Sequence, residues 1–408
     1  MRQLSLAGLL LCACAAPSPR PLAPSSVKLG VDVLEESGFA ALRGKKIGLI
    51  ANQTSKDSRG RSTIDVLAAA PGVTLATIFS PEHGVKGSAD EKVSNDTLTV
   101  SHRVIPIVSL FRGGIKGMRP QQTDLVGLDA LVIDIQDIGT RAYTYLATMG
   151  MALEEAQKAG IEFVVLDRPN PINGATMEGP VLDDLSLRKI TPNAYFAVPV
   201  RHGMTIGEIA RLHNAEVRSP KLTIVPMRGW KRPMWFDQTG LAWTAPSPNM
   251  PDLDAATMYP GIGIFESSNL AVGRGTPIPF RWVGAPWMDG DAVAKEMNAA
   301  LLDGVEFSPQ DFTPTRHVFI GQLCHGVRMR ITDRDKLRPL DVFLKLNEVL
   351  MRRYPDQLQW RWDEVKREVG TDEFHRIIER GGDPLQLKAL FDSGPEQFEK
   401  TRMPYLLY

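Results

Sequence analysis

The chain has 408 residues, and its 47 basic and 47 acidic side chains leave it with no formal net charge. That balance, together with the lack of a long run of like charges, argues against nucleic-acid binding and against adsorption to a membrane through a basic surface. Hydrophobic residues make up 43% of the chain and charged residues 23%, which is typical of a globular protein of about two domains with a normal core.

Residues 1–14 are predicted to be a lipoprotein signal peptide. Their apolar run, residues 4–11, is too short to cross a bilayer and suits a signal-peptide core. The run ends at Cys12 and Cys14, a pattern that resembles a bacterial lipobox with Cys14 as the lipidated residue. An ordinary cleaved signal is the alternative. We expect an exported, periplasmic protein that meets the membrane only through its lipid, and Ala15 after the acceptor favours the outer membrane.

Residues 15–27 are rich in proline and serine and are predicted to form an extended tether. The only cysteine beyond it is Cys324, so no intrachain disulfide is expected once Cys14 is acylated. We predict that Cys324 is a small buried apolar residue rather than a nucleophile.

Residues 28–253 are predicted to form a Rossmann-like, doubly wound α/β domain. Short apolar runs alternate with helical stretches, as in parallel strands joined by helical crossovers. We expect strands at residues 46–51, 75–79, 104–110, 131–135, 162–166, 198–200 and 222–225, and helices at 62–70, 143–158 and 205–216. The first strand runs into residues 52–55 without a G-x-G-x-x-G turn, and no Walker-type loop is present. No cofactor is therefore expected.

Residues 254–408 are predicted to form a smaller α+β domain. Helical patterns at residues 291–302, 338–353, 362–369 and 374–380 accompany a strand-like run at 326–331. The many charged residues in these helices are expected to solvate their outer faces.

Polar residues follow five of the expected strands. Ligands of open α/β sheets bind beyond the carboxyl ends of the strands, so we expect these five strand ends to line one cleft. The residues concerned are Asn52 after the first strand, Glu82 and His83 after the second, Asp134 and Asp137 after the fourth, Asp167 after the strand at 162–166, and Arg201 and His202 after the strand at 198–200.

Glu82 is the strongest catalytic candidate. It lies between Pro81 and Gly84, a rigid entry and a flexible exit that suit a tight active-site turn. A partly desolvated carboxyl group there can have a pKa high enough to protonate a leaving oxygen. A helix-capping or solvated glutamate is the alternative. Asp134, Asp137 and Asp167 are candidates for a second carboxylate, although aspartates in such positions commonly brace turns.

Three arginines are candidates for binding an anion. Arg141, Arg201 and Arg274 can each pair with a carboxylate through two hydrogen bonds, and each can equally form a structural ion pair. The sequence has no H-E-x-x-H motif or compact histidine cluster, so no metal site is expected, and it has no G-x-S-x-G elbow.

Nearly all of the chain after residue 28 resembles the NamZ/YbbC-type family of exo-β-N-acetylmuramidases. Each motif alone is weak, but together they are specific. The matching segments are residues 48–55 (GLIANQTS), 79–84 (FSPEHG), 134–145 (DIQDIGTRAYTY), 166–171 (LDRPNP), 199–205 (PVRHGMT), 246–251 (PSPNMP), 265–269 (FESSN), 273–276 (GRGT) and 405–408 (YLLY).

The resemblance implies a glycoside hydrolase with its site between a Rossmann-like domain and a C-terminal domain. Its substrates would be peptidoglycan fragments, from whose non-reducing ends it would release N-acetylmuramic acid during cell wall degradation or recycling. Glu82 corresponds to the proposed catalytic glutamate, and an arginine would read the lactyl carboxylate that distinguishes this sugar from N-acetylglucosamine. We assign catalytic roles to Glu82, His83 and Asp137, and substrate contacts to Asn52, Arg141, Tyr143, Asp167, Arg201, His202, Glu266 and Arg274.

The sequence leaves the mechanism and two other functions open. A second carboxylate or the substrate's own 2-acetamido group can assist Glu82. The chain can instead be a non-catalytic lipoprotein that binds muropeptides, or a metal-dependent amidase or deacetylase of the same polymer.

Overall fold

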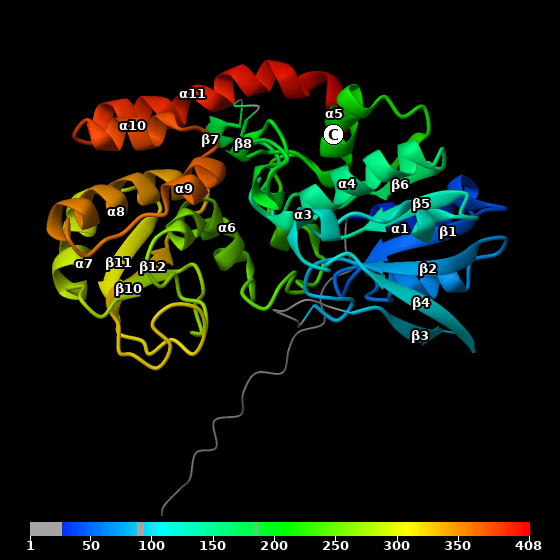
Figure 1. Cartoon of the computed structure of the whole chain (residues 1–408), viewed down its shortest axis with the longest axis horizontal. Helices are drawn as coiled ribbons and strands as arrows, with labels where there is room; N and C mark the ends of the chain where they lie inside the picture. Colours follow the sequence, from blue (N-terminus) through cyan, green and yellow to red (C-terminus); the bar gives the residue numbers. More distant parts are fainter. Residues whose placement is uncertain (1–26, 88–93, 101, 183, 185) are drawn as a thin grey trace, which may run out of the picture.

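The computed structural model describes residues 27–87, 94–100, 102–182, 184 and 186–408. Within these ranges a seven-stranded sheet and its helices form the N-terminal part, and a three-stranded sheet with helices forms a smaller C-terminal part (Figure 1). The predicted α/β fold class, with a smaller α+β domain after a Rossmann-like one, is confirmed. The predicted signal peptide with Cys14 and the tether up to residue 26 lie outside the described residues.

The large sheet has the strand order of a doubly wound fold. Its order is β3-β4-β2-β1-β5-β6-β9, and every neighbouring pair is parallel except β3 with β4. The strands are β1 (Lys46–Ala51), β2 (Thr74–Ser80), β3 (Asp96–Val100), β4 (Arg103–Ser109), β5 (Ala130–Asp134), β6 (Glu162–Leu166) and β9 (Leu222–Val225). The order reverses between β1 and β5, so the carboxyl ends of these two strands flank the topological switch point.

Both faces of this sheet are covered, because successive side chains of its strands enter different cores. Ile47 and Leu49 of β1 pack in one core and Ile50 in the other. The first core is closed by α1 (Gly30–Glu36) and α2 (Thr63–Ala68), and the second by α4 (Thr144–Lys158) and α5 (Ile206–Val217). A short helix, α3 (Gly114–Gly117), follows β4.

Several elements differ from the sequence-based prediction, among them one strand near the main sheet and two elements that were not predicted. The expected strand at residues 198–200 is β8 (Pro199–Arg201), which pairs with β7 (Glu178–Val181) in a separate two-stranded antiparallel sheet. Strand β3 extends the main sheet as an antiparallel edge and was not predicted, because its sequence is polar and largely exposed. Helix α1 was also not predicted.

The C-terminal part packs its helices against a small antiparallel sheet of order β10-β12-β11. Its elements are α6 (Leu253–Ile262), β10 (Trp282–Ala285), α7 (Gly290–Ala299), β11 (Val305–Pro309), β12 (His325–Ile331), α8 (Pro339–Arg353), α9 (Trp362–Val369), α10 (Glu373–Glu379) and α11 (Pro384–Arg402). The larger hydrophobic core continues from α4 through α6 into α8, so the two parts share one interior.

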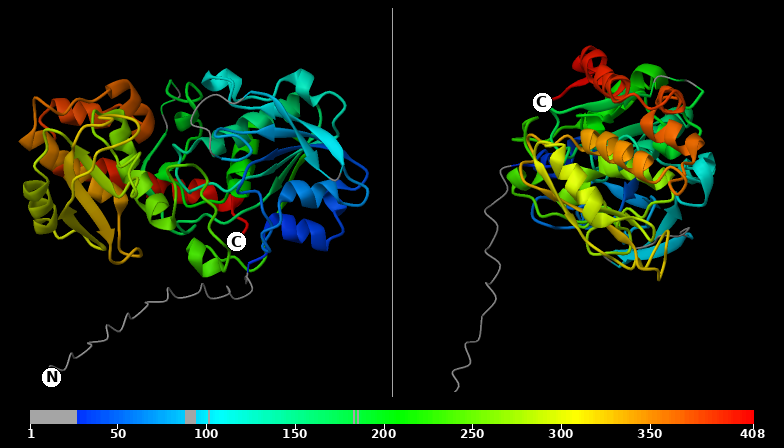
Figure 2. Two further views of the ribbon diagram at one scale, coloured as in Figure 1. Left: turned by 90° about the horizontal axis from the view of Figure 1, so that it is seen from below. Right: turned by 90° about the vertical axis from the view of Figure 1, so that its left-hand side faces the viewer.

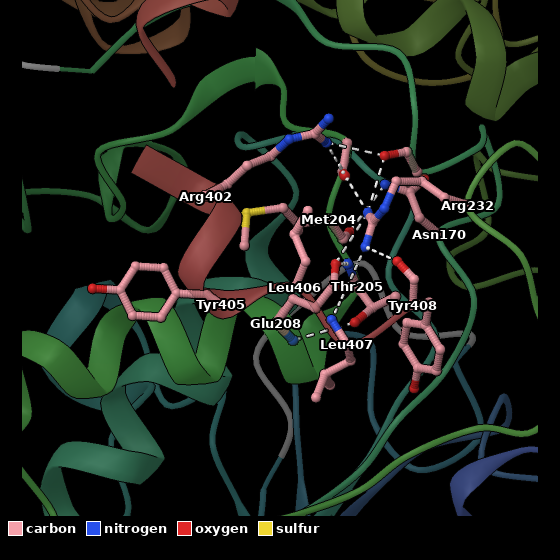
Figure 3. Close-up of polar contacts among 12 residues, drawn as sticks. Asn170, Met204, Thr205, Glu208, Arg232, Arg402, Tyr405, Leu406, Leu407 and Tyr408 are labelled. Carbon is pink, nitrogen blue, oxygen red and sulfur yellow. Dashed lines mark hydrogen bonds and ion pairs between the residues drawn. The ribbon is translucent and has the colours of Figure 1, made fainter. Parts of the chain in front are cut away.

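The last helix, α11, runs from the C-terminal part back over β7 of the N-terminal part (Figures 1 and 2). Gly394 permits the close approach, since a Cβ atom there would lie 2.4 Å from the carbonyl oxygen of Gly179. The residues after α11 then bind next to α5. The main-chain N–H of Leu407 donates to Glu208, and Arg232 bonds both Glu208 and the main-chain oxygen of Tyr408 (Figure 3).

Cys324 is fully buried against Trp282 and Ala271, as predicted, and burial raises the pKa of its thiol to about 11. In the part of the chain that the structure describes, no helix has the length and apolar character needed to span a membrane.

Candidate active site

A polar cavity of about 290 Å³ lies between the N-terminal and C-terminal parts. The carboxyl ends of β2 and β4 and the first turn of α4 form one side, and α6 with the segment that follows it forms the other. Five predicted site residues line it: Glu82, His83, Tyr143, Glu266 and Arg274. Thr144, Asn193, Ser247, Asn249 and Tyr259 also line it.

Glu82 is presented by a tight turn directly after β2. The N–H of Gly84 donates to the Pro81 carbonyl over 3.0 Å, and His83, the third residue of the turn, has a φ of 69°. A non-glycine residue in the left-handed region is uncommon and often marks a functional turn. Thr144 Oγ1 donates a 2.5 Å hydrogen bond to Glu82 Oε2. The carboxyl group of Glu82 is therefore held at the first turn of α4.

Glu266 and Arg274 bring an ion pair to the cavity from the C-terminal part. Nε and Nη2 of Arg274 each donate to a different oxygen of Glu266, the second over 2.9 Å. The guanidinium also lies 5.3 Å from the ring centre of Phe280, within range of a cation–π interaction. Two bonds and a ring fix its plane, so Arg274 is oriented before a ligand arrives.

The remaining polar groups can bind sugar hydroxyl and amide groups. Burial raises the pKa of Tyr143, so its hydroxyl stays protonated and can donate a hydrogen bond. Asn193 Nδ2 donates to Glu368 Oε1 over 2.7 Å, and desolvation raises the pKa of that carboxyl to about 7. Ser247 and Asn249 add a hydroxyl and an amide to the cavity lining.

The structure corrects the prediction that Arg141 contacts the substrate. Its side chain is 1% exposed, and its guanidinium donates to the carbonyl oxygens of Pro180, Val198 and Glu368. Burial without a paired carboxylate lowers its pKa to about 10. Because Glu368 belongs to α9, Arg141 joins the two parts of the molecule and does not face the cavity.

Arg201 and Asp167 are also structural, which corrects two further assignments. Arg201 pairs with Glu178 at 2.6 Å and lies 5.5 Å from the ring centre of Trp235. Asp167 is fully buried and accepts hydrogen bonds from the Thr205 and Tyr408 hydroxyls at 2.8 and 2.7 Å. Neither side chain lines the cavity.

Asn52, Asp137 and His202 are buried and do not line the cavity, which corrects the substrate contacts predicted for Asn52 and His202 and the catalytic role predicted for Asp137. Asn52 Oδ1 accepts from the N–H and hydroxyl of Thr54. Asp137 Oδ2 accepts from the Gly139 N–H at 2.7 Å and lies 3.6 Å from Nε2 of the buried His202. These contacts fix the loops after β1 and β5.

The sequence suggested that the five strand ends line one cleft. In the structure they do not. The segment 244–250 separates them into two groups, because Gln53 Nε2 donates to the carbonyls of Ala245 and Pro246 and holds that segment in place. Sequence reasoning also missed Thr144 and Asn193. Thr144 lies in a motif that carried the family resemblance, whereas the segment around Asn193 gave no signal.

Two family models together match most of the chain. The N-terminal model of the exo-β-N-acetylmuramidase NamZ matches residues 47–254, and the C-terminal model matches residues 257–408. The chain belongs to the NamZ family of exo-β-N-acetylmuramidases. The resemblance inferred from its motifs is thereby confirmed, and NamZ-family membership makes the chain a glycoside hydrolase rather than a non-catalytic muropeptide-binding protein, an amidase or a deacetylase.

Individual relatives agree with this assignment to the NamZ family. The chain is 36% identical over 409 aligned residues to the peptidoglycan β-N-acetylmuramidase NamZ of Bacillus subtilis strain 168, covering 99% of this chain and 97% of that protein. Two crystal structures of DUF1343 family proteins from Bacteroides fragilis NCTC 9343 share the fold. They match with TM-scores of 0.85 and 0.73 and identities of 34% and 28%, each covering 94% of this chain and 99% of the other.

The described residues contain no group of three or more histidine, cysteine, aspartate or glutamate side chains arranged to hold a metal ion. The groups that line the cavity are instead a carboxylate held by a hydroxyl, a fixed guanidinium and several neutral donors. This set suits proton transfer to a glycosidic oxygen and recognition of a substrate carboxylate.

Proposed function

We propose that Glu82 is the general acid and base with which this exo-β-N-acetylmuramidase releases N-acetylmuramic acid from the non-reducing ends of peptidoglycan fragments. One observation carries the proposal: Glu82 and Arg274 line the same cavity from opposite parts of the molecule. The first supplies a proton to the leaving oxygen, and the second pairs with the lactyl carboxylate of the sugar.

The 2-acetamido group of the substrate supplies the nucleophile. Among the described residues, Glu266 is the other carboxylate that lines the cavity, and both of its oxygens are bonded to Arg274. The acetamido oxygen attacks C1 as the glycosidic C1–O bond breaks, and Glu82 protonates the departing oxygen. Glu82 then takes a proton from the water that opens the resulting oxazolinium ring, so the product keeps the configuration of the substrate.

Thr144 and Tyr143 act as positioning groups in this scheme. The Thr144 hydroxyl fixes one oxygen of Glu82, which leaves the other oxygen for the proton that is transferred. Tyr143 remains protonated because burial raises its pKa, so it can donate a hydrogen bond to the sugar. Both groups are supplied by the start of α4, a buried helix that holds them rigidly.

The variant Glu82→Gln tests the proposed acid. It should fold normally but release chromophore from a nitrophenyl N-acetylmuramic acid glycoside at least about 10²-fold more slowly than the native protein. Glu306→Gln is the matched control, because Glu306 is exposed on β11. This variant should release chromophore at the native rate. A native rate for Glu82→Gln would remove Glu82 from this role.

The assisting group is tested with the substrate itself. Replacing its N-acetyl group by N-trifluoroacetyl weakens the attacking oxygen and should slow the first step strongly, and NMR of fresh product should show the β-anomer. An initial α-anomer, or a rate indifferent to fluorination, would contradict assistance by the acetamido group.

For the cellular setting, we propose an exported, lipid-anchored protein on the basis of its N-terminal sequence. Cys14 in its lipobox-like context supports export, lipidation and attachment to the outer membrane, and so a role in cell wall recycling from the periplasmic side. Labelled palmitate should enter the native protein and not Cys14→Ser. Equal labelling of both proteins would contradict anchoring through Cys14.

A further inference from the structure

A second cavity, of about 310 Å³, lies beyond the carboxyl ends of β1, β5 and β6. Thr54 and Lys56 line it after β1, Gln136 after β5 and Arg168 after β6. These strands flank the point at which the sheet order reverses, which is where open α/β sheets place their ligands. In this molecule Glu82, and with it the proposed catalytic chemistry, lies elsewhere, after β2.

The largely buried guanidinium group of Arg168 forms part of the wall of this second cavity. Its side chain is 5% exposed, and Nε and Nη2 bond the two oxygens of Asp134 at 2.5 and 2.9 Å. Nη2 also donates to the Lys56 carbonyl at 2.7 Å. These bonds leave Nη1 without a hydrogen bond to any described residue, so it remains available as a donor on the cavity wall.

Lys56 adds a second cation, which has no carboxylate partner within residues 27–87, 94–100, 102–182, 184 and 186–408. Within the described residues the nearest polar contact of its ammonium group is Thr244 Oγ1, at 3.4 Å. The neighbouring Asp57 is already neutralised, because it pairs with Arg59 and Arg61 at 3.3 and 2.6 Å. The cavity therefore carries net positive charge beside Lys56.

The remaining wall has the character of a sugar site. Both bonds of the Gln136 amide use Nε2, so Oε1 is left as an acceptor for a hydroxyl group. Phe236 and Leu241 supply an apolar side against which a pyranose ring can pack. Hydroxyl groups come from Thr54 and Thr244.

The second cavity is separate from the catalytic one, but the same segment forms part of both. Thr244 lines the second cavity, whereas Ser247 and Asn249 line the catalytic one. Between them, the Pro246 carbonyl accepts hydrogen bonds from Gln53 Nε2 at 3.0 Å and from the Tyr145 hydroxyl at 2.6 Å. A ligand on Thr244 would therefore touch a segment that is fixed at the wall of the catalytic cavity.

We propose that the cavity lined by Lys56, Arg168, Gln136 and Phe236 is a second binding site, for a small sugar that carries a carboxylate. The carboxylate lies between the Lys56 ammonium and Arg168 Nη1, the hydroxyl groups face Gln136 Oε1 and Thr244, and one face of the ring packs on Phe236. The site holds its ligand and performs no chemistry on it. The choice of N-acetylmuramic acid as the probe rests on the proposed function.

Calorimetric titration of the full-length protein with N-acetylmuramic acid tests the proposal. The native protein should bind two molecules. Lys56→Gln should weaken one site at least about 10-fold while turnover continues, and Arg274→Gln should weaken the other. Lys56→Arg, which keeps the charge, and Lys295→Gln, at an exposed position on α7, should both retain two sites.

Two further probes define the ligand class. Uncharged N-acetylglucosamine should not bind the Lys56-dependent site, and glucose 6-phosphate should bind it more weakly than the sugar acid. Native stoichiometry and affinity in Lys56→Gln, equal binding of the uncharged sugar, or tighter binding of the sugar phosphate would each overturn the proposal. Loss of the Lys56-dependent site is measured without turnover, so its outcome is distinct from failure of the catalytic assignment to Glu82.

Discussion

The hydroxyl of Tyr408, the last residue of the chain, donates a 2.7 Å hydrogen bond to the carboxylate of Asp167, which directly follows β6. The same hydroxyl oxygen accepts a 2.8 Å hydrogen bond from the Met227 N–H. Asp167, which the sequence analysis predicted to contact the substrate, thus fixes the C-terminal segment to the central sheet. Burial raises the pKa of Asp167 to about 6. The ionised form of Asp167 is therefore stabilised mainly by the few hydrogen bonds that it accepts, including the one from Tyr408.

Tyr408→Phe should therefore destabilise the protein in a pH-dependent way. Asp167 has a higher pKa in the folded chain than in the unfolded chain, so its ionisation lowers stability as the pH rises through about 6. Removing a donor to the charged form should cost about 1.5–3 kcal/mol at about pH 8 and less at about pH 5. Urea unfolding at the two pH values measures this, and a pH-independent loss would contradict the ionised acceptor.

Asp167 also shows why the site could be predicted only in part. The sequence places Asp167, Arg201 and Glu82 after strands, and Asp167 and Glu82 do follow strands of the main sheet, whereas Arg201 ends β8 in the separate two-stranded sheet. Whether such a residue faces a ligand or the protein depends on elements far along the chain. Tyr408 reaches Asp167 across 241 positions, and no local pattern encodes that pairing.

The strands themselves were largely predictable because burial on both faces demands continuous apolar runs. Residues 46–51 and 162–166 were expected with the observed bounds. Strand β8 has the same apolar character but pairs with β7, which contains Gly179 and Pro180 and lacks a strand-like pattern. Helix α11 contains Pro395 and shows only weak segregation of apolar residues, so its helical state depends on packing over β7 and α8.

Thr144 offers a test of how Glu82 is positioned. Thr144→Val keeps the shape of the side chain but removes the 2.5 Å donor to Glu82, and should lower kcat about 10-fold with little change in KM. Thr144→Ser keeps a hydroxyl and should recover most of the native rate. Steady-state kinetics on a nitrophenyl N-acetylmuramic acid glycoside measure both. Equal rates for the valine and serine variants would show that this hydrogen bond has no part in catalysis.

Arg274 should determine the preference for the charged sugar. Arg274→Gln removes the guanidinium that Glu266 orients, and should lower kcat/KM for an N-acetylmuramic acid glycoside about 10- to 100-fold. The value of kcat/KM for the corresponding N-acetylglucosamine glycoside should change little, so the ratio of the two values falls. Glu266→Gln should lower the ratio in the same direction, because it frees the arginine from its fixed plane. An unchanged ratio in Arg274→Gln would assign recognition of the lactyl carboxylate to another group.

Asn347 of α8 is a buried amide whose replacement should stabilise the chain. Its side chain is 1% exposed, and neither Oδ1 nor Nδ2 has a hydrogen-bond partner among the described residues. Burial of such a group without compensation is unfavourable, so Asn347→Leu, which keeps the branching of the side chain, is larger and is a better helix former, should raise the free energy of unfolding by about 1–3 kcal/mol. Urea unfolding and the nitrophenyl assay should show a more stable enzyme of unchanged activity.

Asn298 of α7 is the contrasting case for this prediction, at an exposed position where the amide groups are hydrogen-bonded. Its Oδ1 accepts from the Phe307 N–H at 3.0 Å and its Nδ2 donates to the Phe307 carbonyl at 2.8 Å, so both amide groups are satisfied. Asn298→Leu should therefore lower stability by about 1–3 kcal/mol, because it leaves two main-chain groups of β11 without these partners. Both substitutions replace asparagine by leucine, but hydrogen bonding alone predicts opposite changes in the free energy of unfolding. If Asn347→Leu were also destabilising, the amide of Asn347 would have to make an interaction in solution that outweighs its desolvation.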